Sequence, residues 1–218
     1  MRFFLAAALT VALFLVHLPS HASGGSYLVD DASVVGAGKC QLESWLRAWS
    51  AGSDGVWAVP ACGVGPVEFG LSLHRQQGEA GLGLSPAVKW QLRNGDDHGI
   101  GLAVEVNTTY QHDRHVASQA YASTSFGLDD ARRWMVDLNL GVDRERDRSA
   151  HPLEGAGVSY ALDERWSLLA ERFWSRGSVS DQAGVRLAFG DSSLDLVVGR
   201  EMARLRSHWV NVGWNAAF

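Results

Sequence analysis

The stretch that decides the fold is the last one, His208-Trp209-Val210-Asn211-Val212-Gly213-Trp214-Asn215-Ala216-Ala217-Phe218. Counting back in twos from Phe218 gives an unbroken apolar face, whereas the alternate positions, such as Asn211 and Asn215, are mostly small or polar. Successive side chains of a β-strand point to opposite faces, and a membrane-spanning strand is apolar toward lipid and polar toward the lumen. This segment therefore predicts a membrane-spanning strand.

The start of the chain predicts export. Arg2 precedes an almost wholly apolar run over 3–18, and Pro19-Ser20-His21-Ala22 offers a cleavage site after Ala22. The alternative is a membrane-anchoring helix, but the run is short for a span of roughly 20 residues and Pro19 interrupts it. We therefore expect a signal peptide over 1–22, an N-terminal periplasmic arm over 23–38 and a transmembrane β-barrel over 39–218.

Composition excludes some classes of protein and favours strands over helices. A net charge of −5 gives no basic surface for nucleic acid. The 24 glycines, 9 tryptophans and 5 prolines favour strands, tight turns and interfacial aromatics. After Ala22 no stretch is continuously apolar for long enough to form a transmembrane helix, so the chain would cross a membrane as strands.

From residue 39 onward the chain divides into about twelve short segments in which apolar and polar residues alternate. The segments are 39–49, 54–62, 66–75, 80–93, 98–112, 117–129, 132–145, 153–163, 165–175, 181–190, 193–203 and 206–218. This pattern predicts an all-β fold, a transmembrane antiparallel up-and-down barrel of about twelve strands, with ten as the alternative. A soluble antiparallel barrel would show the same period.

Turns and aromatic residues favour the membrane. The connections after even-numbered segments are tight, whereas several after odd-numbered segments look longer, at 113–118, 146–152 and 176–180. Short periplasmic turns and longer outer loops are typical of outer-membrane barrels, and an even strand count places both termini in the periplasm. Outward aromatics gather at the short-turn end and predict a girdle at one membrane interface. They are Phe69, Trp90, Phe126, Trp134, Trp166 and Phe189.

The two cysteines fall in register in the first predicted hairpin. A turn centred on Ala51 pairs Cys40 with Cys62 and Trp45 with Trp57. Opposed positions have the Cβ spacing that a disulfide needs, and the periplasm is oxidising. We therefore expect a structural disulfide, with two free thiols as the alternative.

Several short stretches carry a family resemblance. Gly38-Lys39-Cys40-Gln41-Leu42-Glu43, Val59-Pro60-Ala61-Cys62 and Val67-Glu68-Phe69-Gly70-Leu71 resemble the opening of small Gram-negative outer-membrane proteins of the MetA-pathway of phenol degradation type. Asp137-Leu138-Asn139-Leu140-Gly141 and Leu169-Ala170-Glu171-Arg172 resemble later parts of the same pattern. The resemblance implies a barrel in the Gram-negative outer membrane that passes small organic molecules, and it brings no catalytic residues. A terminal aromatic strand, here with Trp214 and Phe218, resembles the signal read by the barrel-assembly machinery.

The inward parity carries most of the charged residues of the predicted strands. They are Glu43, Arg47, Glu68, Lys89, Arg93, Glu105, Asp137, Glu171, Arg186 and Asp195. Buried charges need partners, so acids and bases on adjacent strands would pair. A turn centred between Asp191 and Ser192 puts Arg186 opposite Val197 and diagonal to Asp195, and we expect an ion pair between Arg186 and Asp195.

These charges favour a narrow channel, or passive uptake route, for small molecules, with a closed structural barrel as the alternative. An outer-membrane hydrolase is the third alternative, since Ser72, His74 and Glu68 share one strand face. Side chains two apart on a strand are roughly 7 Å apart, beyond hydrogen-bond reach, so we expect no enzyme. We expect no cofactor and no metal. Outer-membrane lipid, the assembly machinery and a small organic solute are the expected partners.

Overall fold

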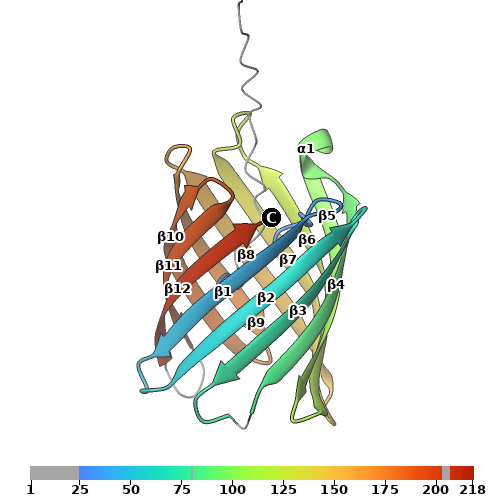
Figure 1. Cartoon of the computed structure of the whole chain (residues 1–218), viewed down its shortest axis with the longest axis vertical. Helices are drawn as coiled ribbons and strands as arrows, with labels where there is room; N and C mark the ends of the chain where they lie inside the picture. The colour runs from blue at the N-terminus through green and yellow to red at the C-terminus, as the bar shows by residue number, and fades with distance from the viewer. Residues whose placement is uncertain (1–24, 80, 203–206) are drawn as a thin grey trace, which may run out of the picture.

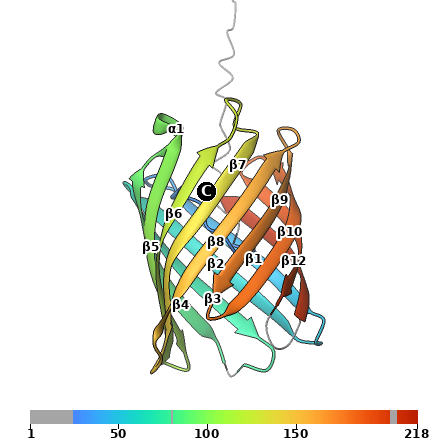
Figure 2. The same ribbon diagram turned by 180° about the vertical axis from the view of Figure 1, so that it is seen from behind.

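The computed structural model describes residues 25–79, 81–202 and 207–218. Twelve strands close into an antiparallel barrel in which each strand pairs with its neighbours in sequence and β12 pairs with β1 (Figures 1 and 2). The strands are β1 (Cys40–Trp49), β2 (Asp54–Val64), β3 (Val67–Gln76), β4 (Gly83–Arg93), β5 (Ile100–Gln111), β6 (Arg114–Gly127), β7 (Trp134–Glu145), β8 (Ala150–Ala161), β9 (Trp166–Ser175), β10 (Ser178–Phe189), β11 (Ser192–Glu201) and β12 (Ser207–Ala217). The predicted fold is confirmed, and the expected signal peptide lies outside the described residues.

The outer face of the barrel is apolar and exposed. Leu46 on β1, Val106 on β5 and Leu140 on β7 keep 62%, 56% and 67% of their surface exposed. Their neighbours in sequence turn polar groups inward, because successive side chains alternate between the faces. Such a band of exposed aliphatic side chains fits lipid. In the described part of the chain no helix is long and apolar enough to cross a membrane.

The aromatics predicted for the girdle lie on this outer face, near the strand ends that carry the C-terminus and the short helix α1 (Gly95–His98) (Figure 1). Phe69, Trp90, Trp134, Trp166 and Phe189 are exposed there. Phe126 is half-buried and lies opposite the outward Ile100. The arrangement is that of an interfacial aromatic ring.

The expected contrast between short and long connections is wrong. β5 and β6 are joined by the tight turn His112–Asp113, and β9 and β10 by Arg176–Gly177, with all four residues at positive φ. The predicted loop 146–152 is shorter than expected, because β7 ends at Glu145 and β8 already begins at Ala150. Strands can continue past the membrane into water, so Arg and His at strand ends do not indicate loops.

Charged residues also form contacts on the outer face and in a turn of the barrel. Arg172, Asp181 and Arg200 form an ion-pair network on the outer face, with Arg172 Nε 2.7 Å and Arg200 Nη2 2.8 Å from the Asp181 carboxylate. In the turn between β8 and β9, the Asp163 carboxylate accepts hydrogen bonds from the backbone N–H groups of Arg165 and Trp166. These bonds hold the pKa of Asp163 below its usual range.

The register of the first hairpin is as predicted. Cys40 lies opposite Cys62 and Trp45 opposite Trp57, and the cysteines form a disulfide. The register between β10 and β11 is not as predicted. Arg186 lies directly opposite Asp195, because the turn consists of Gly190 and Asp191 alone and begins earlier than expected.

Candidate functional site

The candidate site is the lumen, which is crossed by residues 25–38, called the arm below. In Figures 1 and 2 the start of the described chain, in blue, lies inside the ring of strands near the end that carries α1. Val29, Ala32 and Val35 of the arm are only 3%, 2% and 4% exposed. The sequence predicted a periplasmic arm, whereas the described part of that segment is enclosed by the barrel.

The barrel wall supplies hydrogen-bond partners to the arm backbone. Glu171 on β9 accepts from the N–H groups of Leu28 and Val29, at 3.0 and 3.4 Å. Asn139 on β7 accepts from the N–H of Asp30 at 2.8 Å and donates to its carbonyl oxygen at 2.7 Å. The arm forms no regular element that would pair these groups, and buried backbone groups need partners. The inward polar side chains therefore hold the arm in place.

The same pattern continues toward β1. Ser125 Oγ on β6 accepts from the N–H of Ala32 at 2.8 Å, and Glu68 on β3 accepts from the N–H of Val35 at 2.7 Å. These contacts come from strands on several sides of the barrel, so the arm is fixed across the lumen rather than along one strand.

An ion pair adds charge complementarity between arm and wall. Lys89 Nζ on β4 lies 2.8 Å from the Asp30 carboxylate and 3.6 Å from that of Asp31. The Lys89 side chain is only 6% exposed and the two aspartates 19% and 13%. A buried lysine needs an anionic partner, and the arm provides two.

Inward glycines leave room for the arm. A Cβ on Gly63 of β2 would lie 1.9 Å from the carbonyl oxygen of Val35, and one on Gly157 of β8 would lie 3.4 Å from Val29. Gly63 also forms a parallel bridge with Ala37. Close approach between two backbones is possible at Gly63 only without a side chain.

The expected ion pair between Arg186 and Asp195 is present. Arg186 Nε and Nη2 lie 2.7 and 2.9 Å from the two carboxylate oxygens of Asp195. The guanidinium also lies 4.5 Å above the ring of Tyr27 in the arm. This pair therefore forms part of the lumenal surface that holds the arm.

Most of the other predicted lumenal residues also face inward. Glu43 is buried beside Gly25 of the arm. Glu105 accepts a hydrogen bond from Asn107 at 3.1 Å, and Asp137 accepts one from Ser125 at 2.5 Å. Arg47 on β1 donates from Nε to Asn211 at 2.7 Å.

Arg93 is the exception among the predicted lumenal residues. A register shift between Gln91 and Arg93 puts Arg93 opposite Leu102, which faces outward. Arg93 is exposed and donates to the carbonyl oxygen of His98 at 3.2 Å. The extra residue in β4 moves the side chain to the other face, which simple alternation could not predict.

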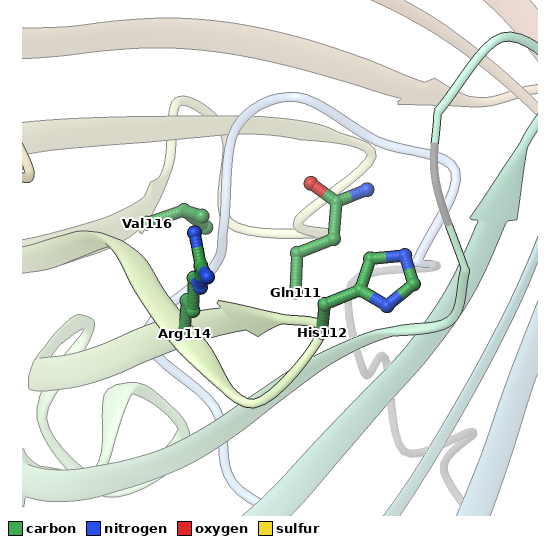
Figure 3. Close-up of a pocket in the computed structure, with 4 residues that line it drawn as sticks. All are labelled: Gln111, His112, Arg114 and Val116. Atoms are coloured by element: carbon green, nitrogen blue, oxygen red, sulfur yellow. The ribbon is translucent and has the colours of Figure 1, made fainter.

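The lumen beyond the arm is polar and partly open to solvent. Asn107, Thr109 and Gln119 face inward and are half-buried, whereas Lys89 and Glu171, which hold the arm, are buried. At the mouth opposite the C-terminus and α1, a hollow of about 450 Å³ is lined by Gln111, His112, Arg114 and Val116. Figure 3 shows these four side chains around the turn between β5 and β6.

The residues considered for a hydrolase do not form a catalytic set. Glu68 accepts from the arm at Val35, and the His74 ring stacks on Trp57, 6.2 Å between centroids. Among the described residues, Ser72 and His74 form no hydrogen bond with each other. No group of three or more His, Cys, Asp or Glu side chains within that part of the chain is placed to hold a metal ion.

The docking of the arm was missed by sequence reasoning. The adjacent acids Asp30 and Asp31, within a mostly apolar stretch, were a signal that this segment meets a cation. The inward glycines Gly155 and Gly157 were a second signal, because glycine leaves space on the inner face of a strand.

A family model described as "Uncharacterised conserved protein UCP029691" matches residues 11–218. No curated protein matches the sequence. The fold is similar to the solved structure "KdgM porin in complex with disordered oligogalacturonate", with a TM-score of 0.67, 11% identity, and coverage of 82% of this chain and 99% of that one.

Two further solved structures share the fold. One is a NanC porin, with a TM-score of 0.60, 8% identity and coverage of 81% of this chain and 98% of that one. The other is the COG4313 outer membrane channel from Pseudomonas putida F1, with a TM-score of 0.54, 11% identity and coverage of 86% of this chain and 98% of that one. At such identities the likeness concerns the fold, which is that of porin-like outer-membrane barrels.

Proposed function

The chain belongs to the family of uncharacterised conserved proteins UCP029691, and we propose that it is a narrow channel of the Gram-negative outer membrane whose passage is restricted by its own arm. The carrying observation is that the arm crosses a polar lumen and is held there by hydrogen bonds and the ion pair of Lys89 with Asp30. Such contacts can be exchanged for contacts with water, so the arm can dissociate from the barrel wall without breaking a covalent bond.

Three observations support a channel. The lumen beyond the arm carries half-buried polar side chains, including Asn107 and Gln119. The outer face is apolar and carries an aromatic ring near one end. The fold is that of solved structures named porins and a channel. The resemblance of the stretches around Cys40 and Cys62 to the phenol-degradation type supports small organic molecules as the solutes.

We also propose where the termini lie and which partners the barrel meets. Both termini would lie in the periplasm, with the barrel in contact with outer-membrane lipid and assembled by the barrel-assembly machinery through Trp214 and Phe218. Residues 1–22 would be removed as a signal peptide. Passive passage requires no catalytic residue.

A closed structural barrel is the second candidate. It is favoured by the depth at which the arm is buried, with Val29 and Ala32 almost inaccessible. The channel and the closed barrel differ in whether the arm ever dissociates from the barrel wall, so an experiment that locks the arm in place distinguishes them.

A reversible crosslink can lock the arm. A Cβ on Gly101 of β5 would lie 3.1 Å from that of Ala32, close to the separation in a disulfide. The double variant A32C/G101C should conduct in planar bilayers only after reduction. The wild-type protein, measured with and without reductant, controls for the native disulfide. Equal conductance of the oxidised and reduced double variant would refute control by the arm, and silence in all samples would favour the closed barrel.

A further inference from the structure

A second cluster of side chains lines the lumen beside the arm, on β1, β2, β3 and β12. It is called the aromatic cluster below and consists of Trp45, Arg47, Trp49, Trp57, His74 and Trp209. All six belong to the inward parity of their strands, opposite the exposed aliphatic residues such as Leu46 and Val56.

The rings of the cluster form a stacked series along the wall. Trp57 stacks on Trp45 with 5.4 Å between centroids and an interplanar angle of 3°. On its other side it stacks on His74, at 6.2 Å and 15°. Trp49 lies against Trp57 at 5.9 Å and 55°. Aromatic side chains on adjacent strands thus offer a continuous apolar, polarisable surface.

Glycines on neighbouring strands make room for these rings. A Cβ on Gly83 would lie 2.1 Å from the His74 ring, and one on Gly199 would lie 2.2 Å from the Trp209 ring. The rings therefore lie over the neighbouring strand and line the wall. Trp45, Trp49 and Trp57 remain half-buried, so part of their surface faces the lumen.

Arg47 is the charged member of the cluster. Its Cζ lies 5.0, 5.6 and 5.7 Å from the ring centroids of Trp209, Trp49 and Trp57. Within residues 25–79, 81–202 and 207–218, Arg47 forms no ion pair, whereas the inward cations Lys89 and Arg186 each do. Among the described residues its side chain donates from Nε to Asn211, which leaves the terminal guanidinium N–H groups for another acceptor.

Two indole groups of the cluster also lack acceptors. Trp45 Nε1 and Trp209 Nε1 are buried without a hydrogen-bond partner among the described residues, and Trp209 as a whole is only 4% exposed. Buried donors are normally paired. The indole of Trp209 lies against Gly199 of β11, so the group that a ligand can reach from the lumen is Arg47. A cation without an ion pair in the described part of the chain favours a ligand that brings negative charge and oxygen atoms.

We propose that the aromatic cluster binds a small ring-bearing carboxylate that enters from the lumen. The carboxylate would meet the free N–H groups of Arg47, where charge-assisted and bidentate hydrogen bonds are available. The ring would pack against Trp49 and Trp57. This inference rests on the proposed function, since it names the class of solute that the channel would select.

Equilibrium binding to the refolded protein in detergent tests the site without a membrane current. Benzoate and glucuronate carry the same charge on an aromatic and a sugar ring, while benzyl alcohol and glucose are their neutral counterparts. By calorimetry, at least one carboxylate should bind saturably and about tenfold more tightly than its neutral counterpart. Which carboxylate binds identifies the ring class. Equal affinity for charged and neutral rings, or no saturable binding, would overturn the proposal.

Variants separate the two parts of the site. Arg47→Gln should weaken carboxylate binding about tenfold and leave the neutral ring unaffected, whereas Trp49→Leu should weaken both. Arg93→Gln on the outer face is the matched control and should change neither. Arg47→Lys keeps the charge but loses the paired guanidinium N–H groups, so it should bind carboxylate less tightly than the wild-type protein and more tightly than Arg47→Gln. If the glutamine variant fails to fold, the lysine variant is compared with the wild-type protein alone. Unchanged carboxylate binding by a folded Arg47 variant would refute the site.

The outcomes also separate this site from the channel itself. A barrel that binds the carboxylate yet never conducts would retain the site and contradict the channel. A barrel that conducts but binds neither carboxylate would retain the channel and contradict the site.

Discussion

Lys89 of β4 and Asp30 of the arm lie 2.8 Å apart inside the barrel. Their ion pair joins a residue predicted to line the lumen to a segment predicted to lie outside it. It is one of the contacts that hold the arm inside the barrel.

Lys89→Met should release the arm. The change removes the lysine that pairs with Asp30 and Asp31 in a buried site, and breaking a buried pair in this way costs about 3–5 kcal/mol. Cleavage by a protease that cuts before aspartate, followed by mass spectrometry, should be faster at Asp30 in the variant. Lys39→Met, at an exposed lysine just before β1, is the control. An arm that stays equally protected in both variants would contradict its anchoring by Lys89.

The Cys40–Cys62 disulfide closes a loop with a sequence separation of 22. Replacing both cysteines with serine should lower the free energy of unfolding by about 3 kcal/mol, because the unfolded chain regains the freedom that the loop removed. Urea unfolding in lipid vesicles measures the change. Recovery of two alkylatable thiols from the exported wild-type protein would show that the bond does not form.

Arg186→Met should destabilise the folded protein. Asp195 has no exposed side-chain surface and Arg186 is 12% exposed, so the pair is dry and its loss should cost about 3–5 kcal/mol. Arg132→Met breaks an exposed pair with Asp96 and should cost under about 1 kcal/mol. Unfolding midpoints of the two variants make the comparison. Equal costs would mean that water reaches the Arg186 site.

Phe218 is predicted to act in assembly through its side chain. Its backbone N–H and carbonyl oxygen both pair with Cys40, at 2.8 Å each, and so help to close the barrel. Phe218→Ala retains these bonds, so a loss of assembled protein in cells would trace to the aromatic ring alone. Phe189→Ala removes another exposed ring of the outer face and should assemble normally. Normal assembly of Phe218→Ala would remove the basis for a terminal signal.

Strand positions could be predicted because each strand has one lipid face, and a slip of one residue would turn that face inward. The pairings of Cys40 with Cys62 and of Trp45 with Trp57 followed from a turn centred on Ala51, and the structure has both. The alternation of lipid-facing and inward residues does not predict where a turn begins or where a strand contains an extra residue. The pairing of Arg186 was displaced because the Gly190–Asp191 turn is tighter than expected, and Arg93 was misplaced by an extra residue in β4.

The arm could not be predicted by the same means, because it has no regular period and its contacts are dispersed. Leu28, Ala32 and Val35 are held by Glu171, Ser125 and Glu68, which come from three different strands. Only the closed barrel brings these residues together. The aromatic cluster is likewise assembled by closure, since Trp209 of β12 meets Arg47 of β1 across the last strand pairing.

Single-channel recording of the refolded protein with and without residues 25–36 tests the central claim most directly. Both forms should fold in detergent and migrate differently on a gel with and without boiling, which establishes that the barrel is intact. The account predicts brief, infrequent openings for the full mature chain and steady current steps for the shortened one. A folded, shortened barrel that carries no current would contradict a channel restricted by its arm.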